Sequence, residues 1–335
     1  MNNLSKQASK QANKPLTKEK TDCLKGVLAI AVLIHHLYQS SGMLRGTICG
    51  YILQAVGCWT VAEFFFLSGH GLTVSYHKKG EPYIKQFVKS RIIPFYIVEI
   101  LLTGIYMVRN CVLSENLSKK IIIQSFLFGD TVIDGGWYLQ MQLVLYILWF
   151  LVYKISVRDG LKQRMILAGI LIICFAMNVL GYTITWYGGI VSFYLGALWA
   201  EHEKNITLFL SERINWIGCL ILSGIVFNIM YVCGRLLVNY KIGVIAHIIS
   251  MTAFAICATT FACKTSVECK LTRFLGKISF EIYGIQFLFL DIYRRSKIYS
   301  NSIGIYILLV IISTVATAWV LHPVTEKVYH RCRSH

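Results

Sequence analysis

The chain of 335 residues is 56% hydrophobic and only 15% charged, which is far more apolar than a soluble globular protein of this length. Its formal net charge of +17 would suit a nucleic-acid-binding protein, but no RNP-like motif or zinc-finger spacing accompanies that charge. The eleven cysteines are scattered singly, without a CxxC pair, so we interpret them as packing residues. The composition indicates an integral membrane protein.

The apolar segments, taken in chain order, predict an all-α polytopic protein. Residues 1–19 are polar and lack the apolar region of a cleavable signal peptide, so we expect a disordered cytoplasmic tail followed by an uncleaved first span. One membrane domain would cover residues 20–325, and a second cytoplasmic tail would cover 326–335. About 20 helical residues cross a bilayer. This length predicts ten spans, at 22–40, 52–76, 92–112, 137–153, 164–181, 185–201, 214–233, 242–262, 274–293 and 302–321.

The distribution of Lys and Arg fixes the expected orientation. Most of these residues fall in the tails and in alternate loops, which places both termini in the cytoplasm by the positive-inside rule. The cluster of Arg294, Arg295 and Lys297 falls on the opposite side. It is either a site for an anionic substrate or lipid headgroup, or the result of a misjudged span boundary. The segment 118–136 is the longest outer connection, and its apolar middle is too short to span, so it is re-entrant or lies on the surface.

Ionisable residues in the first two spans suggest a reaction centre, because charged groups are costly at membrane depth. Lys25 and His36 are eleven residues apart, so a helix places them on one face about 16 Å apart. Glu63 would lie at a similar depth on the neighbouring second span and could orient the His36 imidazole as a general base. The alternative is a purely structural Glu–His pair.

Other polar residues near these two carry weaker hypotheses. His35 is rotated by about 100° from His36 and could equally be a packed core histidine. Ser68 lies in a Ser-Gly-His-Gly sequence inside an apolar helix, which is not the strand-to-helix setting of a serine-hydrolase nucleophile. The glycines beside it more plausibly allow close helix approach. No residue spacing favours a metal site, since adjacent histidines cannot share one helix face.

Basic and aromatic residues flank the third and fourth spans. Lys85, Lys89 and Arg91 form a cationic inner rim that could bind phosphate groups, or could be ordinary positive-inside charge. Trp137 and Tyr138 open the fourth span and are first of all interfacial anchors. Further polar residues at membrane depth have no assigned partners at this stage; they are Glu99, His247, Glu281, Gln286 and Asp291.

Five motifs in order give the chain a family resemblance. The first is a basic residue followed eleven positions later by a histidine, here Lys25 and His36. The others are Glu63–Gly69 (EFFFLSG), Arg91–Tyr96 (RIIPFY), Trp137–Leu139 (WYL) and Gly276–Gln286 (GKISFEIYGIQ). With these motifs the chain resembles the acyltransferase 3 family of bacterial integral membrane acyltransferases, in which the position of Lys25 is usually an arginine. In the last motif Gln286 replaces a histidine that is frequent in the family, so the role of that histidine is open here.

The resemblance implies a membrane-bound O-acyltransferase, most simply an O-acetyltransferase of the bacterial cytoplasmic membrane. The donor would be cytoplasmic acyl-CoA as co-substrate, without a further cofactor, and the acceptor a hydroxyl of a carbohydrate or cell-envelope glycan. The interpretation then has three groups: His36, Glu63 and His35 at the reacting centre; Lys25, Ser68, Lys89 and Arg91 toward acyl-CoA; and Trp137, Tyr138 and Gln286 toward the acceptor. The alternative is an exporter of a saccharide or lipid-linked intermediate, although the two halves show no self-similarity.

Overall fold

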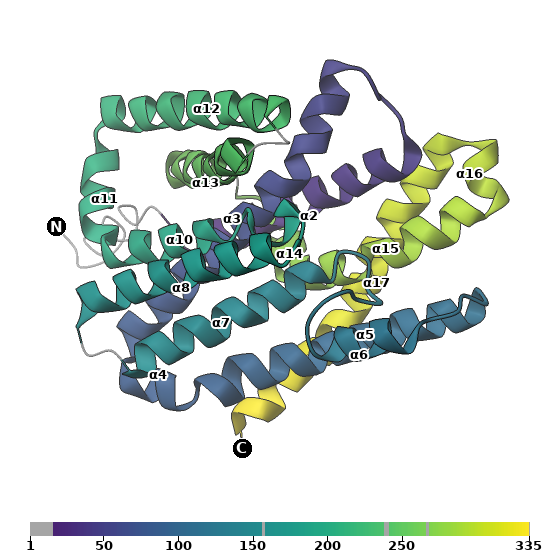
Figure 1. The fold of residues 1–335 in the computed structure, drawn as a ribbon, viewed down its shortest axis with the longest axis horizontal. Coiled ribbons are helices and arrows are strands. Elements are labelled where there is room, and N and C mark those ends of the chain that lie inside the picture. The colour runs from purple at the N-terminus through teal and green to yellow at the C-terminus, as the bar shows by residue number, and fades with distance from the viewer. Residues whose placement is uncertain (1–15, 156–157, 238–240, 266–267, 335) are drawn as a thin grey trace. The chain divides into compact units, whose positions relative to one another are not determined.

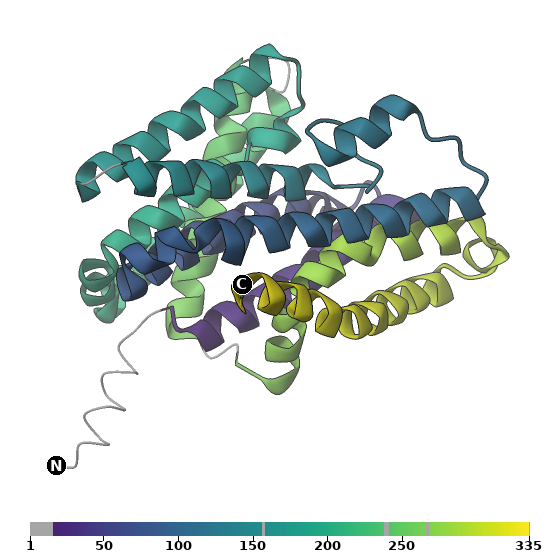
Figure 2. The same ribbon diagram turned by 90° about the horizontal axis from the view of Figure 1, so that it is seen from below.

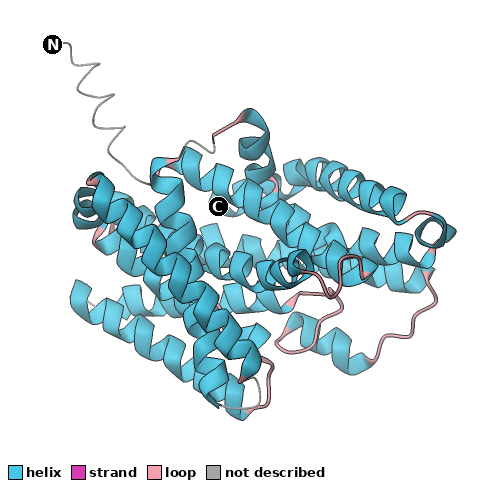
Figure 3. Cartoon of the chain, turned by 90° about the horizontal axis from the view of Figure 1, so that it is seen from above, coloured by secondary structure: helices cyan, strands magenta, loops and turns pink. Residues whose placement is uncertain are grey.

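A computed structural model describes residues 16–155, 158–237, 241–265 and 268–334. Within these residues the chain forms helices joined by loops and contains no strand, so the expected all-α class is confirmed (Figure 3). Most of the predicted N-terminal tail lies outside the described residues. Eight of the described helices are long and apolar enough to cross a membrane. They are α2 (Lys18–Ser41), α3 (Ile48–Lys79), α5 (Ile93–Val112) together with the preceding η1 (Val88–Ile92), α7 (Trp137–Ile155), α8 (Asp159–Val179), α12 (Arg213–Leu236), α13 (Lys241–Lys264) and α17 (Ile303–Ser334).

Two of the ten predicted spans are built from shorter helices. The segment 185–201 forms α9 (Ile184–Tyr187) and α10 (Val191–Glu201), with a turn at Gly188–Ile190 between them. The segment 274–293 contains the end of α14 (Lys270–Lys277) and most of α15 (Ser279–Arg295). At 17 residues, α15 is about 26 Å long, slightly less than the hydrocarbon thickness of a bilayer.

The C-terminal residues continue the last long helix. Helix α17 continues through Ser334, although Pro323 lies inside it. Residues 326–334 of the expected cytoplasmic tail are therefore helical, and their cytoplasmic location stays a prediction. The short apolar middle of the segment 118–136 forms α6 (Lys119–Phe126), whose first turn is capped by the Ser118 hydroxyl accepting from the Ile121 backbone N–H at 3.2 Å.

The chain divides into two compact units. The first comprises Met1–Leu28, Cys58–Lys78 and Gln163–Lys277, and the second comprises Ala29–Gly57, Lys79–Lys162 and Ile278–His335. In the first unit α12 packs along α13, and α10 and α11 (Glu203–Ser211) complete the packing (Figure 1). The helices α2 and α3 contribute residues to both units.

In the second unit the main packing is between α15 and α17, which run side by side (Figure 2). Helix α5 packs on both of them, and η1 packs on α7 and α17. Aromatic stacking joins the residue before η1 to α7: Phe87 stacks on Trp149 with ring centroids 5.1 Å apart, and Trp149 stacks on Tyr153 at 4.1 Å. The remaining short helices of the unit are α4 (Glu81–Lys85) and α16 (Lys297–Asn301).

Candidate active site

A small hydrophobic core in the second unit determines where His36 lies. Leu33 and Leu37 of α2 are buried against Leu290 of α15 and against Tyr306 and Val310 of α17. Residues three and four apart share one helix face, so His36 and Ser40 lie on the same side of α2 as these leucines. The Ser40 hydroxyl is hydrogen-bonded to the Tyr306 hydroxyl at 2.7 Å. His36 is thereby held beside α15.

His36 lies in the second half of α2. It lies five residues before Ser41, the last residue of α2, which is about 7.5 Å along the helix axis. The middle of the helix is near Ala29. The depth of His36 in the membrane stays a prediction.

The contacts of His36 define its tautomer. Nδ1 lies 3.2 Å from Gln39 Oε1, which can only accept a hydrogen bond, so Nδ1 carries the proton. Nε2 then has a lone pair available, as a general base requires. The imidazole also lies against the Phe287 ring, with centroids 4.4 Å apart.

His35 has a different environment. Its Nδ1 is 2.7 Å from the Leu53 carbonyl oxygen of α3, and its side chain is buried. A Cβ on Gly57 would come within 2.3 Å of His35 Nε2, so the ring is also enclosed by the α3 backbone. These contacts favour the packed core histidine over a reacting group.

A pocket of about 500 Å³ opens beside His36 within the second unit. Its walls come from the ends of α2, α5 and α15 and from the connection 113–136. The lining combines basic, acidic and neutral polar side chains with two apolar ones. The lining residues are His36, Gln39, Ser40, Arg109, Glu115, Asp134, Phe287, Leu290, Asp291, Arg294 and Arg295.

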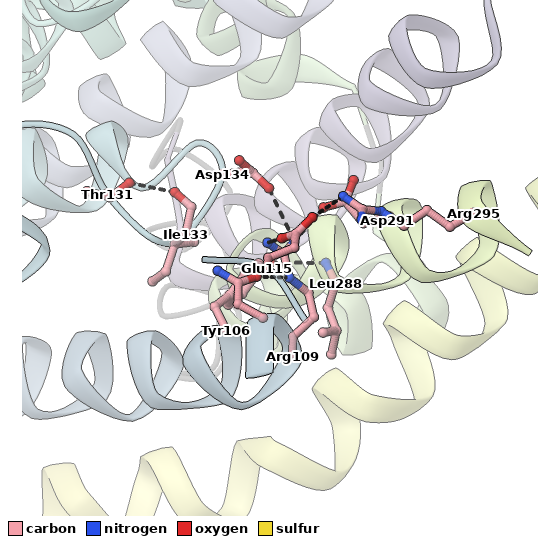
Figure 4. A network of polar contacts seen from close by, with 10 residues as sticks. Tyr106, Arg109, Glu115, Thr131, Ile133, Asp134, Leu288, Asp291 and Arg295 are labelled. Carbon is pink, nitrogen blue, oxygen red and sulfur yellow. Dashed lines mark hydrogen bonds and ion pairs between the residues drawn. The ribbon is translucent and has the colours of Figure 1, made fainter. Parts of the chain in front are cut away.

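A buried arginine organises the acidic wall of this pocket (Figure 4). Arg109 is 8% exposed. Its guanidinium donates to Asp291 and lies 3.4 Å from Asp134 Oδ2 and 3.6 Å from Glu115 Oε2. Glu115 also pairs with Arg295. The carboxylates compensate the buried charge, and together they tie α5 and the following connection to α15.

The predicted acceptor-side residues lie next to the pocket but do not line it. The Tyr138 ring packs on Tyr283 with centroids 4.7 Å apart, and the Tyr283 hydroxyl donates to the Gly135 carbonyl at 2.9 Å. Gln286 is buried; its amide donates to the Tyr283 carbonyl at 3.2 Å, while its Oε1 has no hydrogen-bond partner within the described residues. Trp137 packs edge-on against Tyr138. The chain neighbour of Gln286, Phe287, is the residue of this motif that lines the pocket.

The predicted donor-side residues of the second unit lie in and beside η1. Arg91 is half-buried, and its Nε donates to the Tyr83 hydroxyl at 3.3 Å. Lys89 is exposed on the same turn. The π-helical turn Val88–Ile92 ends just before Pro94, and π-helical turns are frequent at functional sites.

Glu63, Ser68 and Lys25 belong to the first unit. Glu63 is fully buried at the middle of α3, and its Oε1 accepts a hydrogen bond from the Thr259 hydroxyl at 2.9 Å. Its Oε2 has no partner among the described residues. The pairing of Glu63 with His36 stays a prediction. Lys25 and Ser68 are half-buried on α2 and α3.

The expected role of the glycines beside Ser68 agrees with the structure. A Cβ on Gly69 would lie 2.0 Å from the Phe193 carbonyl oxygen, and one on Gly196 would lie 1.9 Å from the Phe66 carbonyl oxygen. The backbones of α3 and α10 are therefore in direct contact at these two glycines.

Several hydrogen bonds and ion pairs between ionisable residues were not predicted from the sequence. Glu281 pairs with His322 Nδ1 at 3.0 Å and accepts from the Thr325 hydroxyl, which joins α15 to α17. The sequence did not single out Arg109, and it left Asp291 without an assigned partner. Their partnership spans 182 positions, so no local pattern signals it. The side chain of Lys297 lies outside the described residues.

Comparison with known proteins gives one match. The family model of an acyltransferase domain, the acyltransferase 3 type, matches residues 19–322. No curated protein and no solved structure matches the chain.

Proposed function

Because the chain belongs to the acyltransferase 3 family and is thus a membrane acyltransferase, we propose that it moves an acyl group from acyl-CoA to a carbohydrate hydroxyl. The acyl group is most simply acetyl, and the acceptor is a saccharide or glycan of the cell envelope. The protein would work as a multi-pass protein of the bacterial cytoplasmic membrane, with the donor entering from the cytoplasm and no additional cofactor.

The observation that carries this proposal is the position of His36 on the polar pocket. Its Nδ1 donates to Gln39, and its unprotonated Nε2 is the atom that chemistry on a hydroxyl requires. Nε2 would take the proton of the acceptor hydroxyl while the oxygen attacks the thioester carbonyl. The carbon–sulfur bond then breaks, and the imidazolium returns the proton to the leaving CoA thiolate. In an alternative route, Nε2 takes the acyl group from the thioester and then passes it to the acceptor hydroxyl, whose proton goes to the CoA thiolate. This route uses the same residue and gives the same products.

Arg91 and Lys89 are the proposed contacts of the second unit with CoA. A guanidinium binds phosphate through two parallel hydrogen bonds, and a lysine adds a point charge. The Tyr83 hydroxyl orients Arg91 from the side. In the first unit, Lys25 and Ser68 would contribute to the donor site, and Glu63 would support the reacting centre.

The test is acyl transfer by purified His36→Ala protein in detergent. The assay uses radiolabelled acetyl-CoA and, as acceptor, envelope membranes of the producing organism. We expect transfer to fall by about 10²-fold or more, the usual contribution of a general base. His202→Ala is the matched control, because this exposed histidine lies between α10 and α11 in the first unit and does not line the pocket. Equal transfer by His36→Ala and the wild type would refute the proposal.

A further inference from the structure

We propose that the pocket beside His36 selects an uncharged saccharide, with Asp134 and Arg294 binding its hydroxyls and Phe287 supporting its ring. This inference rests on the proposed function, since it names the class of acceptor for the same site. Asp134 and Phe287 were not among the predicted site residues, and Arg294 was named only within the basic cluster of Arg294, Arg295 and Lys297.

The charges that line the pocket are balanced. Three arginines, Arg109, Arg294 and Arg295, face three carboxylates, and His36 is neutral in the tautomer derived above. An anionic ligand would lose its hydration on entering and would find no net positive charge in exchange. A pocket built for a phosphate or carboxylate would instead carry an excess of arginine or lysine.

Most of the balanced charges are already engaged with one another. Arg109 is buried among Asp291, Asp134 and Glu115, and Arg295 pairs with Glu115. These contacts use the guanidinium groups that would otherwise hold an anion. They leave most of the wall's charge internally compensated.

Two groups of opposite sign remain accessible on the pocket wall. The Asp134 side chain is 53% exposed; it lies 3.4 Å from Arg109 Nη1 and also contacts the Asp291 carboxyl group. Arg294 is exposed and makes no hydrogen bond or ion pair within the described residues. The pocket thus offers a carboxylate acceptor and a guanidinium donor at the same time.

A sugar hydroxyl suits this pair because it both donates and accepts hydrogen bonds. Neighbouring hydroxyls of one ring can donate a hydrogen bond to the Asp134 carboxylate and accept a hydrogen bond from the Arg294 guanidinium. An anionic group could accept a hydrogen bond from Arg294 but could donate none to Asp134, and the exposed Asp134 carboxylate would repel it.

The apolar part of the pocket agrees with a sugar ring. Phe287 is partly exposed, and Leu290 lies one turn further along α15. The C–H face of a pyranose can cover such an aromatic surface while its hydroxyls point to the polar wall. Since the Phe287 ring also touches His36, a sugar bound there presents a hydroxyl next to the imidazole.

The experiment compares two acceptors that differ in one group. Purified protein in detergent is given radiolabelled acetyl-CoA and either p-nitrophenyl β-D-glucopyranoside or p-nitrophenyl β-D-glucuronide, which carries a carboxylate on the same ring. We expect the wild type to prefer the glucoside in kcat/KM by about tenfold or more. Asp134→Asn should raise the KM for the glucoside about tenfold and leave the KM for acetyl-CoA unchanged. It should also reduce the ratio of kcat/KM for the glucoside to kcat/KM for the glucuronide. Asp130→Asn is the matched control, because Asp130 is exposed in the same connection and does not line the pocket.

The outcomes separate this inference from the proposed function. Equal or better use of the glucuronide by the wild type, or an unchanged glucoside KM in Asp134→Asn, would overturn the inference. So would transfer to envelope membranes with no transfer to either glycoside, although the proposed function would then stand. Absence of transfer to the membranes as well would refute both.

Discussion

The imidazole of His36 lies against the Phe287 ring with centroids 4.4 Å apart and an interplanar angle of 55°. The contact joins the first helix of the membrane domain to α15, and both residues line the same pocket. Together with the Gln39 hydrogen bond, it fixes the orientation of the imidazole from two sides. In the proposed reaction, a base held in this way needs no reorganisation before it meets the acceptor hydroxyl.

Phe287→Leu should therefore impair catalysis while preserving the fold. Leucine keeps the apolar character but loses the flat surface that orients His36, so we expect kcat to fall about tenfold. The measurement is acetyl transfer to envelope membranes by purified protein. Phe289→Leu is the control, because Phe289 lies two residues further on α15 and is absent from the pocket lining. If both variants lose activity equally, the loss reflects general packing of α15 and not the contact with His36.

Arg109 is predicted to be the main determinant of stability around the pocket. Arg109→Ala would remove the counter-charge that Asp291, Asp134 and Glu115 share, and because these carboxylates are partly exposed we expect a cost of about 1.5–3 kcal/mol. Arg294→Ala, at an exposed arginine on the same pocket, should leave stability unchanged. Thermal unfolding of the purified variants in the same detergent checks this prediction. A similar unfolding temperature for Arg109→Ala and the wild type would show that the network contributes no net stability.

The glycines of the Ser-Gly-His-Gly sequence should differ in their tolerance of a methyl group. Gly69→Ala places a Cβ 2.0 Å from the Phe193 carbonyl oxygen, so α3 and α10 must separate. Gly71 has no atom within 4 Å of its would-be Cβ, and alanine there should be neutral or slightly stabilising because it lowers the entropy of the unfolded chain. Thermal unfolding and expression level of the two variants provide the comparison. Equal tolerance at both positions would contradict the close approach of the two helices.

The sequence predicted those features that depend on residues close together in the chain. Apolar runs predicted the long helices, because a span needs about 20 apolar residues, and the 100° rotation between neighbouring helical positions separated His35 from His36. The structure agrees: His35 contacts the Leu53 carbonyl, whereas His36 contacts Phe287.

The pocket could not be predicted in the same way. Asp134, Phe287 and Asp291 come from a connection and a late helix, and only tertiary packing brings them beside His36. Trp137 and Tyr138 were predicted on the acceptor side, but neither residue lines the pocket.

Gly57 is predicted to be required for the position of His35. Alanine there would place a Cβ 2.3 Å from His35 Nε2 and would force the ring away from the Leu53 carbonyl oxygen. We expect Gly57→Ala to lower the unfolding temperature, and Gly104→Ala, with no atom within 4 Å of its Cβ, to leave it nearly unchanged. The double variant His35→Ala with Gly57→Ala should recover part of the loss, because removing the ring makes room for the methyl group. Strictly additive effects of the two changes would show that Gly57→Ala destabilises the protein by another route than the His35 ring.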